Sequence, residues 1–371
     1  ITTHFEYHCM EDNLLKLDML GHDDPSMIRM LEDLTGVNAR AIPLDDPDTM
    51  SIFTSSKVLG FENDELLGPT GAVAIPEFNT RFTRQMLIDT QPKDFNTLVR
   101  LSGFSHGTDV WLGNARELIV GGTASVLQTV GCRDDIMLYL ISMGLDPKMS
   151  FKIMEAVRKG KVKKGGFQEG WVEAMEEHGV PQWYIESLAK IGYLFPKAHA
   201  VAYVMMAFRI AWFKVHEPLA FYATFFTIRA KAFDAEFCCA GKEAVERKIH
   251  EIENNKDATA VEQNLLVTLE VCYEFYLRGF HFDTIDIYRS DASKFIITEG
   301  GLLPPLISVH GLGEAAAQDT VEKRKGKTFI SVEEFSMCCS KLSKTHIEQL
   351  KALGAFAGMA DTSQVNLFDG L

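Results

Sequence analysis

The sequence predicts a mostly α-helical protein with a minor β part, and three features of the chain point to this class. Apolar residues recur at helical spacing through most of its length, as in "SFKIMEAVRKGK" and "PQWYIESLAKIGYL". Short turns containing Gly and Pro separate these segments. Only "FHFDTIDIYRSDASKFIITEGGLLPPL" alternates apolar and polar residues, which is the pattern of a strand or two.

Helix starts and stops are marked by polar caps and glycines. Asp24 and Ser26 can cap the first helix, which Gly36 ends, and Ser102 with Gly103 is expected to end the third. The expected helices are 27–34, 77–92, 95–101, 133–145, 150–161, 170–179, 181–194, one or two within 198–228, 244–252, 261–278 and two short pairs within 308–356.

Length and composition fit a globular protein with two or three domains. The chain has 371 residues, of which 46% are hydrophobic and 24% charged. It holds no uninterrupted apolar run of about 18 residues, so we expect no membrane span and a cytoplasmic location. Its seven cysteines form no C-x-x-C pair, which indicates reduced thiols rather than disulfides or a zinc site. Because the chain begins "ITTHFEYH", without methionine or a leader, we expect a piece of a longer protein.

The charge is unevenly distributed. A net charge of −14 argues by itself against a nucleic-acid-binding protein. Two local strips are basic, however, one in "KIMEAVRKGKVKKGG" and one in "VEKRKGK". An acidic body can bind phosphates through such strips, although each is equally well explained as a solvated loop.

A short apolar run near the start, "NLLKLDMLGHDDP", carries two charges. Lys16 and Asp18 are two residues apart, so in a strand both side chains lie on the same face. Burying a charge is costly unless it is paired or holds a metal ion. A second acidic pair, Asp46 and Asp48, has D-x-D spacing, but the neighbouring Pro47 favours a turn and a helix cap over a metal site.

The stretch "LISVHGLGEAAAQDTVEKR" fits a helix-hairpin-helix. Gly311 and Gly313 would bring backbone N–H groups close to a DNA phosphate at a helix N-terminus. Such a motif contacts the sugar-phosphate backbone without reading bases. "SKTHIEQLKALGAF" looks like a second, degenerate copy, and the strip Lys323–Lys327 follows the first. The alternative is an ordinary pair of helices with glycines in the turn.

Two further segments carry polar residues suited to phosphate binding. In "YLFPKAHAVAYVMMAFRIAWFKVHEP", Lys197, His199 and Tyr203 lie near a helix start, with a core helix carrying snorkelling cations as the alternative. In "RLSGFSHGTDVW", small donors flank His106, which suits a phosphate loop and a plain turn equally well.

Seven blocks, in order, give the chain a family resemblance. They are "NLLKLDMLGHDDP", "IPEFNTRFTRQML", "LVRLSGFSHGTDVWLGNARELI", "GCRDDIMLYLI", "FKIMEAVRKGK", "GYLFPKAHAVAYVMMAFRIAWFKVHEPLAFYATFF" and the tail "QVNLF". From Thr2 onward the chain resembles the C-terminal part of bacterial DNA polymerase III alpha subunits of the PolC type. One departure is His310, where a proline is usual in the family.

The resemblance implies templated nucleotide addition with two Mg²⁺ ions held by three carboxylates. It assigns the third carboxylate to Asp18 and a nucleotide-phosphate contact to Lys16, and the other two carboxylates lie upstream of this chain in the family. Two such ions activate the primer 3′-hydroxyl and stabilise the leaving pyrophosphate. The resemblance further implies nucleotide contacts at His106, Arg158, Lys159, Lys197, His199 and Tyr203. It implies DNA contacts at Gly311, Gly313, Lys323, Arg324 and Lys325.

The resemblance also divides the chain and names partners. It implies the end of a palm domain with a palm strand in 1–26, helical fingers in 27–231, a duplex-binding domain in 232–358 with tandem helix-hairpin-helix motifs in about 303–356, and a flexible tail in 359–371. The expected partners are primer-template DNA, deoxynucleoside triphosphates, a sliding clamp and the replisome. The clamp contacts are Gln364, Leu367 and Phe368.

Two classes of function stay open from the sequence. The first is part of a DNA-directed DNA polymerase, inactive alone because two of the three metal carboxylates are absent. The alternative is a non-enzymatic helix-hairpin-helix module that binds DNA. A helical repeat scaffold is a more distant alternative, which the lack of a fixed period argues against.

Overall fold

A computed structural model describes residues 4–6, 9–10, 13–15, 17 and 21–362. Their helices, including short 3₁₀ turns and one π segment labelled η, are α1 (Asp24–Thr35), η2 (Ala39–Ala41), α2 (Pro47–Ser51), η3 (Lys57–Leu59), α3 (Arg81–Thr90), α4 (Phe95–His106), η4 (Trp111–Ala115), α5 (Arg116–Val120), η5 (Val126–Gln128), α6 (Arg133–Ser142), α7 (Pro147–Arg158), α8 (Lys161–Gly165), α9 (Trp171–Glu177), α10 (Gln182–Lys190), α11 (Lys197–His216), α12 (Pro218–Ile228), η6 (Ala230–Ala232), α13 (Ala235–Cys238), α14 (Lys242–Asn254), α15 (Ala260–Leu277), η7 (Leu306–Ser308), α16 (Glu314–Arg324), α17 (Val332–Cys338) and α18 (Lys344–Ala352).

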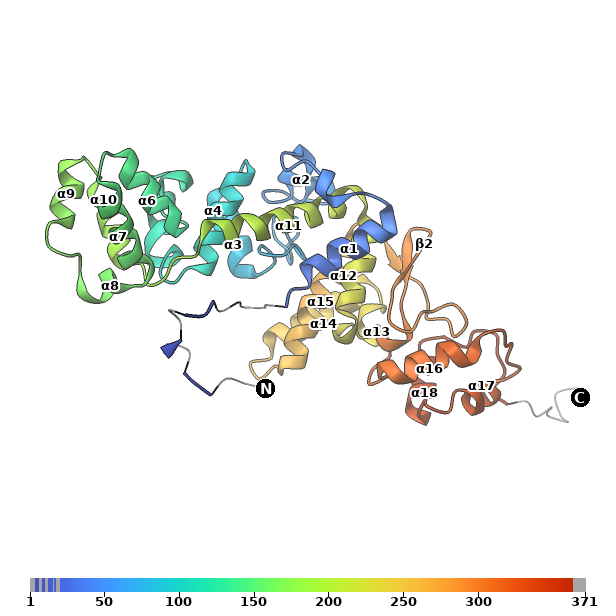
Figure 1. Ribbon diagram of the computed structural model, residues 1–371. Helices are drawn as coiled ribbons and strands as arrows, with labels where there is room; N and C mark the ends of the chain where they lie inside the picture. Colours follow the sequence, from blue (N-terminus) through green and yellow to red (C-terminus); the bar gives the residue numbers. More distant parts are fainter. Residues whose placement is uncertain (1–3, 7–8, 11–12, 16, 18–20, 363–371) are drawn as a thin grey trace, which may run out of the picture.

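The small β part is one mixed sheet, which confirms a mostly α chain with a minor β part. Its strands are β1 (His281–Phe282), β2 (Ile296–Thr298) and β3 (Gly301–Leu303), in the order β1-β3-β2. β1 runs parallel to β3, and β2 runs antiparallel to it, with Ile297 opposite Leu302. Figure 1 shows this sheet between the helical body and the C-terminal helices α16–α18.

The long helix α11 is the axis of the helical body. It starts after Pro196, ends before Pro218 and packs against α1, α2, α4, α6 and α12 (Figure 1). Of the helices in the described part of the chain, it alone has the length and hydropathy to cross a membrane, and 44% of its apolar window is buried inside the structure. A core helix meets the same criteria.

Lys214 near the end of α11 contradicts the expectation of a snorkelling cation. Its side chain is fully buried, and Nζ lies 2.7 Å from a carboxylate oxygen of Glu274 on α15. Nζ also donates to the carbonyls of Gly71 (2.8 Å) and Val73 (2.6 Å), while Tyr222 donates to the same Glu274 carboxylate at 2.6 Å. Burial lowers the pKa of Lys214 to about 8, although Glu274 opposes that shift. Lys214 therefore ties the 71–73 loop, α12 and α15 together.

Helix α4 is longer than its sequence predicts. The expected stop at Ser102 and Gly103 is wrong, because α4 continues to His106 and ends at Gly107. Gly103 serves packing instead: a Cβ there would lie 2.4 Å from the carbonyl oxygen of Gly131. The "SGFSHG" segment is thus the last turn and a half of a helix and not a loop.

Two other expectations concern short elements. Asp46 caps α2, its carboxylate accepting from Thr49 N–H at 2.9 Å, as predicted.

No strand forms at residues 13–15 or at Leu17, and the leucines there are exposed. A strand needs a neighbour for its backbone hydrogen bonds, and the described residues place none there.

The C-terminal region forms three helices rather than two full pairs. The second pair, α17 and α18, matches expectation, whereas the first hairpin is preceded only by the three-residue η7 and followed by α16. Phe329, Phe335 and Phe356 pack together in the core of this region. The ring centroid of Phe335 lies 5.2 Å from that of Phe329 and 5.2 Å from that of Phe356.

Candidate functional site

Three segments that lie far apart in the sequence meet at residues 192–197, just before α11. The N–H of Thr108, beyond the end of α4, donates to the carbonyl of Tyr193 at 3.0 Å. The N–H of Leu194 donates to the carbonyl of Arg158, at the end of α7, at 3.3 Å. The end of α4, the α7–α8 turn and the start of α11 therefore form one continuous region, and these are the segments that carry the predicted nucleotide contacts.

A ladder of five rings runs across this region. His22 contacts Tyr203 (centroids 4.5 Å apart), Tyr203 stacks on His199 (4.1 Å, 19°), and His199 meets the edge of Phe195 (4.5 Å). Phe195 in turn stacks on His106 (4.9 Å, 21°). Flat, partly exposed rings in such a row are suited to contact a nucleobase face.

Glu77 lies next to His106, the last ring of the ladder. The sequence analysis did not identify it as a functional residue. Its carboxylate lies 2.6 Å from Nε2 of His106 and accepts from the hydroxyl of Ser102 at 3.0 Å. Burial alone would raise the pKa of Glu77, but the hydrogen bond and charge of His106 hold it below its usual value. The same hydrogen bond raises the pKa of His106, while burial lowers the pKa of His199.

The predicted cations sit beside the ladder, each with an acidic neighbour. Nζ of Lys197 lies 3.6 Å from Asp135, and Lys159 lies 3.0 Å from Glu155. Arg158 also hydrogen-bonds Glu155 and, with Lys159, lowers the pKa of that carboxyl to about 2. These pairs leave the cations partly exposed, with 36% of the Lys197 side chain and 22% of the Arg158 side chain accessible.

Three cations of the region have no salt bridge within the described residues. Lys161 and Lys164 are exposed on α8. Arg133 is half-buried at the start of α6, and its backbone N–H donates to the carbonyl of Phe195. Arg133 was missed, because "GCRDD" reads as a helix start with two acidic residues. An unpaired arginine is well suited to bind a phosphate group.

The predicted metal ligand, Asp18, is not part of the region described above. Lys16 and Asp18 lie outside the described residues. Among the residues that are described, no three His, Cys, Asp or Glu side chains gather to hold a metal ion.

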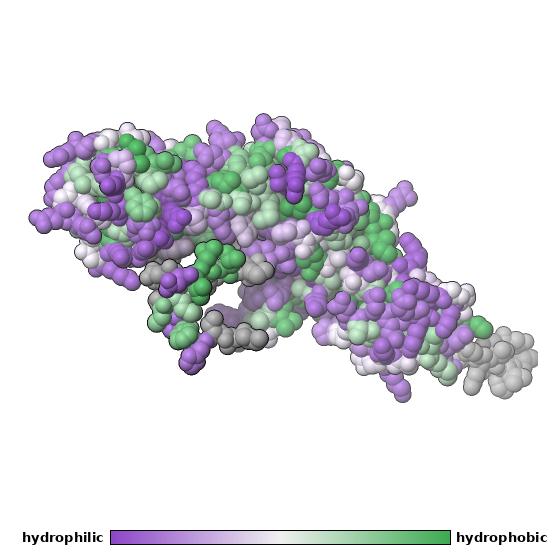
Figure 2. All heavy atoms as spheres, in the orientation of Figure 1, coloured by the Kyte–Doolittle hydropathy of each residue, from purple (hydrophilic) through white to green (hydrophobic). Residues whose placement is uncertain are grey.

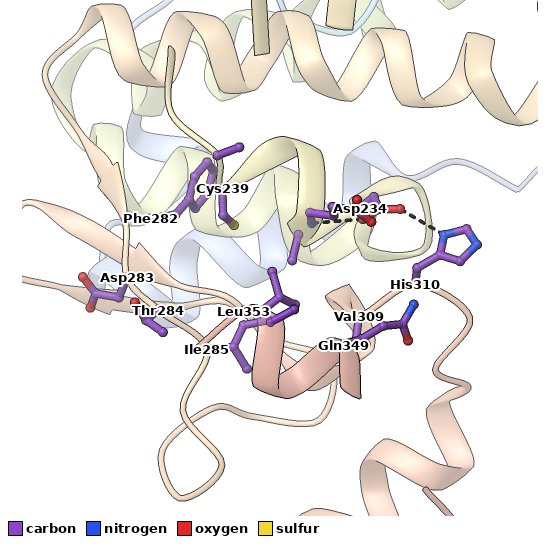
Figure 3. A pocket seen from close by; sticks show the side chains of 14 residues that line it. Asp234, Cys239, Phe282, Asp283, Thr284, Ile285, Val309, His310, Gln349 and Leu353 are labelled. Atoms are coloured by element: carbon purple, nitrogen blue, oxygen red, sulfur yellow. Dashed lines mark hydrogen bonds and ion pairs between the residues drawn. The ribbon is translucent and has the colours of Figure 1, made fainter. Parts of the chain in front are cut away.

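The two glycines of the first C-terminal hairpin lie in its turn and directly before α16. Gly311 has φ of +75°, where a Cβ is strained, and Gly313 precedes α16 with no side chain over the helix end. The N–H groups of Glu314 and Ala315 donate to no acceptor within the described residues. His310 is held by Asp234, with Nδ1 2.9 Å from the carboxylate (Figure 3).

The second hairpin resembles the first at its helix start but not in its turn, because Gly311 has φ of +75° and Lys341, in the equivalent position, has no positive φ. Leu312 N–H donates to the carbonyl of Val309 at 3.0 Å, and Leu342 N–H donates to that of Cys339 at 2.9 Å, so the two turns share this hydrogen bond. Lys341 and Ser343 stand where the first hairpin has glycines, and Ser343 caps α18 by accepting from His346 N–H at 3.1 Å.

The strip Lys323–Lys327 is only partly available. Arg324 is buried, and its guanidinium donates to the carbonyls of Ile287 (2.6 Å) and Ser290. This contradicts its predicted DNA contact, because a structural arginine occupies the inner face of α16. Lys323 pairs with Asp319 at 3.1 Å, and exposed Lys325 pairs with Glu322 at 2.7 Å.

Lys344, at the start of α18, is exposed and has no salt bridge in the described chain. It was missed because the second hairpin lacks the glycine signature. Hydrophilic side chains dominate the visible face of this C-terminal unit (Figure 2). The predicted clamp contacts Gln364, Leu367 and Phe368 lie outside the described residues.

Two family models match separate parts of the chain. Residues 24–179 match the bacterial DNA polymerase III alpha subunit finger domain, and residues 279–365 match the helix-hairpin-helix motif. A finger domain and a helix-hairpin-helix unit in one chain define a part of a bacterial DNA polymerase III alpha subunit.

Full-length relatives narrow the class. The chain is 56% identical over 369 residues to a DNA polymerase III PolC-type of Caldanaerobacter subterraneus subsp. tengcongensis, and 51% identical to that of Halalkalibacterium halodurans. It is 48% identical to that of Streptococcus pneumoniae. The alignments cover 99–100% of this chain and 25–26% of each relative, so the chain spans about a quarter of their length. The chain belongs to the PolC-type DNA polymerase III family.

Proposed function

We propose that this chain supplies the nucleotide-binding fingers and a duplex-binding unit of a DNA-directed DNA polymerase. The observation that carries the proposal is the convergence of "SGFSHG", "RKGK" and "FPKAHAVAY" on one region of a chain that is about half identical to PolC-type polymerases. The proposed division is the end of a palm in 1–26, fingers in 27–231, the duplex-binding unit in 232–358 and a clamp-binding tail in 359–371.

The incoming deoxynucleoside triphosphate binds beside α11 in this proposal. His199 and Tyr203 offer stacked rings to the base, and Lys197 with Arg158 and Lys159 offers positive charge to the triphosphate. His106 lies at the far end of the ladder and supports Phe195. Arg133 adds an unpaired guanidinium to this set.

Two Mg²⁺ ions would activate the primer 3′-hydroxyl and stabilise the leaving pyrophosphate in the whole enzyme. Asp18 and Lys16 are proposed to serve there, together with carboxylates from outside this chain. The described residues bind and orient nucleotide and DNA, and no metal-dependent step is assigned to them.

Duplex DNA is proposed to lie on the C-terminal unit. Gly311 and Gly313 expose backbone N–H groups at the start of α16. Lys323 and Lys325 add positive charge at the other end of α16, and Lys344 adds it at the start of α18. Because these groups contact only the DNA backbone, binding is expected to be insensitive to sequence and sensitive to salt.

The tail is proposed to bind a sliding clamp and thereby join the replisome. Leu367 and Phe368 would insert as apolar anchors, while Gln364 supplies hydrogen bonds. Burying two such side chains contributes roughly 1.5–3 kcal/mol each. Calorimetry with a peptide of residues 363–371 and a bacterial clamp tests this, and no heat at high micromolar peptide would remove the assignment.

A second function is favoured for the chain by itself. Because the proposed metal site needs carboxylates from outside this chain, we expect the chain alone to bind DNA without polymerising. The alternative of a DNA-binding module without any enzymatic role predicts the same result for the isolated chain.

An experiment on the full-length enzyme distinguishes a polymerase part from a non-enzymatic DNA-binding module. Asp18→Asn in the full-length polymerase should abolish primer extension while primer-template affinity stays within about twofold. Retention of a tenth of the wild-type turnover would remove Asp18 from the metal site.

A further inference from the structure

Glu77 is held in an unusual backbone conformation beside the ring ladder. It has φ of +69°, and Ala74 in the same turn has φ of +63°, a region that residues other than glycine rarely adopt. The turn is fixed at its base, because Ala74 N–H donates to Asn79 at 2.6 Å and buried Lys214 donates to the carbonyl of Val73. Strain of this kind persists where surrounding contacts impose it, and it clusters at functional sites.

In this conformation the Glu77 carboxylate faces His106 and Ser102. Only 11% of the side chain is exposed, and it lies 2.6 Å from Nε2 of His106, with Ser102 as its second donor. The His106 ring lies almost parallel to Phe195, at 4.9 Å and 21°. Phe195 then meets His199, which stacks on Tyr203.

We propose that Glu77 is a positioning residue for the nucleotide site, fixing the His106 ring so that Phe195, His199 and Tyr203 present a rigid face to the incoming base. The inference rests on the proposed nucleotide-binding function. Glu77 itself is largely covered, and its carboxylate hydrogen-bonds His106 and Ser102, so its effect passes through His106. Pre-organising a binding face lowers the cost of binding without adding a contact.

Other charged groups face the same turn and define its pH dependence. His199 on α11 lies near both members of the pair, Asp24 of α1 lies near Glu77, and His22 lies near His199 and Asp24. The Glu77 hydrogen bond raises the pKa of His106, so the protonated pair persists to higher pH than an isolated histidine would allow. Deprotonation above that pKa weakens the pair, and nucleotide affinity should then decline.

The test is Glu77→Gln in the full-length polymerase, which keeps the length of the side chain and its bond to Ser102 but removes the charge. We expect KM for the deoxynucleoside triphosphate to rise about tenfold, with kcat within about twofold. The decline in affinity with rising pH should begin at lower pH than in the wild type. An unchanged KM together with an unchanged pH profile overturns the positioning role.

A spectroscopic measurement separates this inference from the proposed function. In the 371-residue chain labelled at histidine and phenylalanine, Glu77→Gln should lower the NMR titration midpoint of His106 and shift the ring resonances of Phe195 and His199. If the wild-type enzyme adds no nucleotides, the proposed function fails while these shifts still decide the positioning role. Unchanged Phe195 and His199 resonances contradict it.

Two glycine variants control for backbone strain. Glu77→Gly removes the carboxylate and relieves the positive φ, so KM should rise as in Glu77→Gln. Gln91→Gly relieves a comparable conformation (φ +46°) at the end of α3, away from the ladder, and should leave KM unchanged. A similar rise in both variants would assign the effect to the backbone and overturn the proposal.

Discussion

The two C-terminal hairpins share a turn hydrogen bond and an extended residue before the helix, but they differ in turn conformation and in chemistry. Each places a buried leucine, Leu312 or Leu342, between two turn residues and starts a helix directly afterwards. The first hairpin presents bare backbone at Gly311 and Gly313 but begins its helix with acidic Glu314. The second covers its helix start with the Ser343 cap and carries Lys341 and Lys344.

In the proposed DNA contact, the two hairpins would bind one phosphate backbone in different ways. Glycines let the DNA approach the N–H groups closely, whereas lysines act over a longer distance through charge. The hairpins also contact each other, because Lys341 lies 3.0 Å from Asp319 on α16. The Lys341 hydrogen bond and the Lys323 charge lower the pKa of Asp319, so this link stays ionised at neutral pH. This ion pair joins the two hairpins, which in the proposed DNA contact would form one surface with two kinds of contact.

A carboxylate at the first hairpin should have the largest effect. Gly313→Asp puts a negative charge where a phosphate is expected, while φ of −74° and the absence of any atom within 4 Å of a new Cβ leave the fold intact. We expect affinity for a non-specific duplex at low salt to fall about tenfold or more, with a thermal midpoint no lower than wild type, because Asp is a good N-cap.

The matched variant is Ser343→Asp, which adds the same charge where a cap already covers the helix end. Fluorescence anisotropy should show a smaller loss for it than for Gly313→Asp. Equal losses would mean that bare backbone confers nothing special on the first hairpin.

Backbone conformation gives the next largest effect. Gly311→Ala forces a Cβ into φ of +75° and should destabilise the chain by about 1 kcal/mol, with DNA affinity falling several-fold as the turn distorts. Gly358→Ala, at φ of +79° after α18, carries similar strain outside both hairpins. Denaturant melts of the two should agree, and a DNA defect shared by both would refute a local role for Gly311.

Charge at the second hairpin should matter through salt dependence. Lys344→Gln removes an exposed, unpaired cation, so affinity should fall about threefold and the slope of log K against log salt should become shallower by about one. Lys325→Gln is the control, since Lys325 already pairs with Glu322 and should change the slope less. A larger change in the control would reverse this ranking of the lysines.

The smallest effect on DNA affinity is expected from Glu314, whose negative charge opposes phosphate binding at the first hairpin. Glu314→Gln removes the carboxylate from the first turn of α16, and we expect duplex affinity to rise about twofold, while the helix loses a few tenths of a kcal/mol of favourable dipole interaction. Titrations at two salt concentrations check this, and a weaker complex would show that Glu314 faces away from DNA.

The sequence by itself determined much of this protein. Helical periodicity and Gly or Pro punctuation gave the helix order, because these signals are local and a few residues are enough to express them. Asp46 was identified as a cap, and Gly311 and Gly313 as turn residues, for the same reason. Family resemblance gave Lys197, His199 and Tyr203 as candidates, but periodicity could not show how their rings stack.

Only the tertiary structure decided which side chains act together. Glu77 and His106 are 29 residues apart, and nothing in "IPEFN" indicates a left-handed glutamate. Gly103 looked like a helix stop, but close packing on Gly131 lets α4 continue through it. Arg324 looked like a DNA contact, yet two backbone carbonyls hold it inside. Burial and long-range pairing depend on what the rest of the chain brings to a residue, which is why local patterns locate candidate residues and the fold assigns their partners.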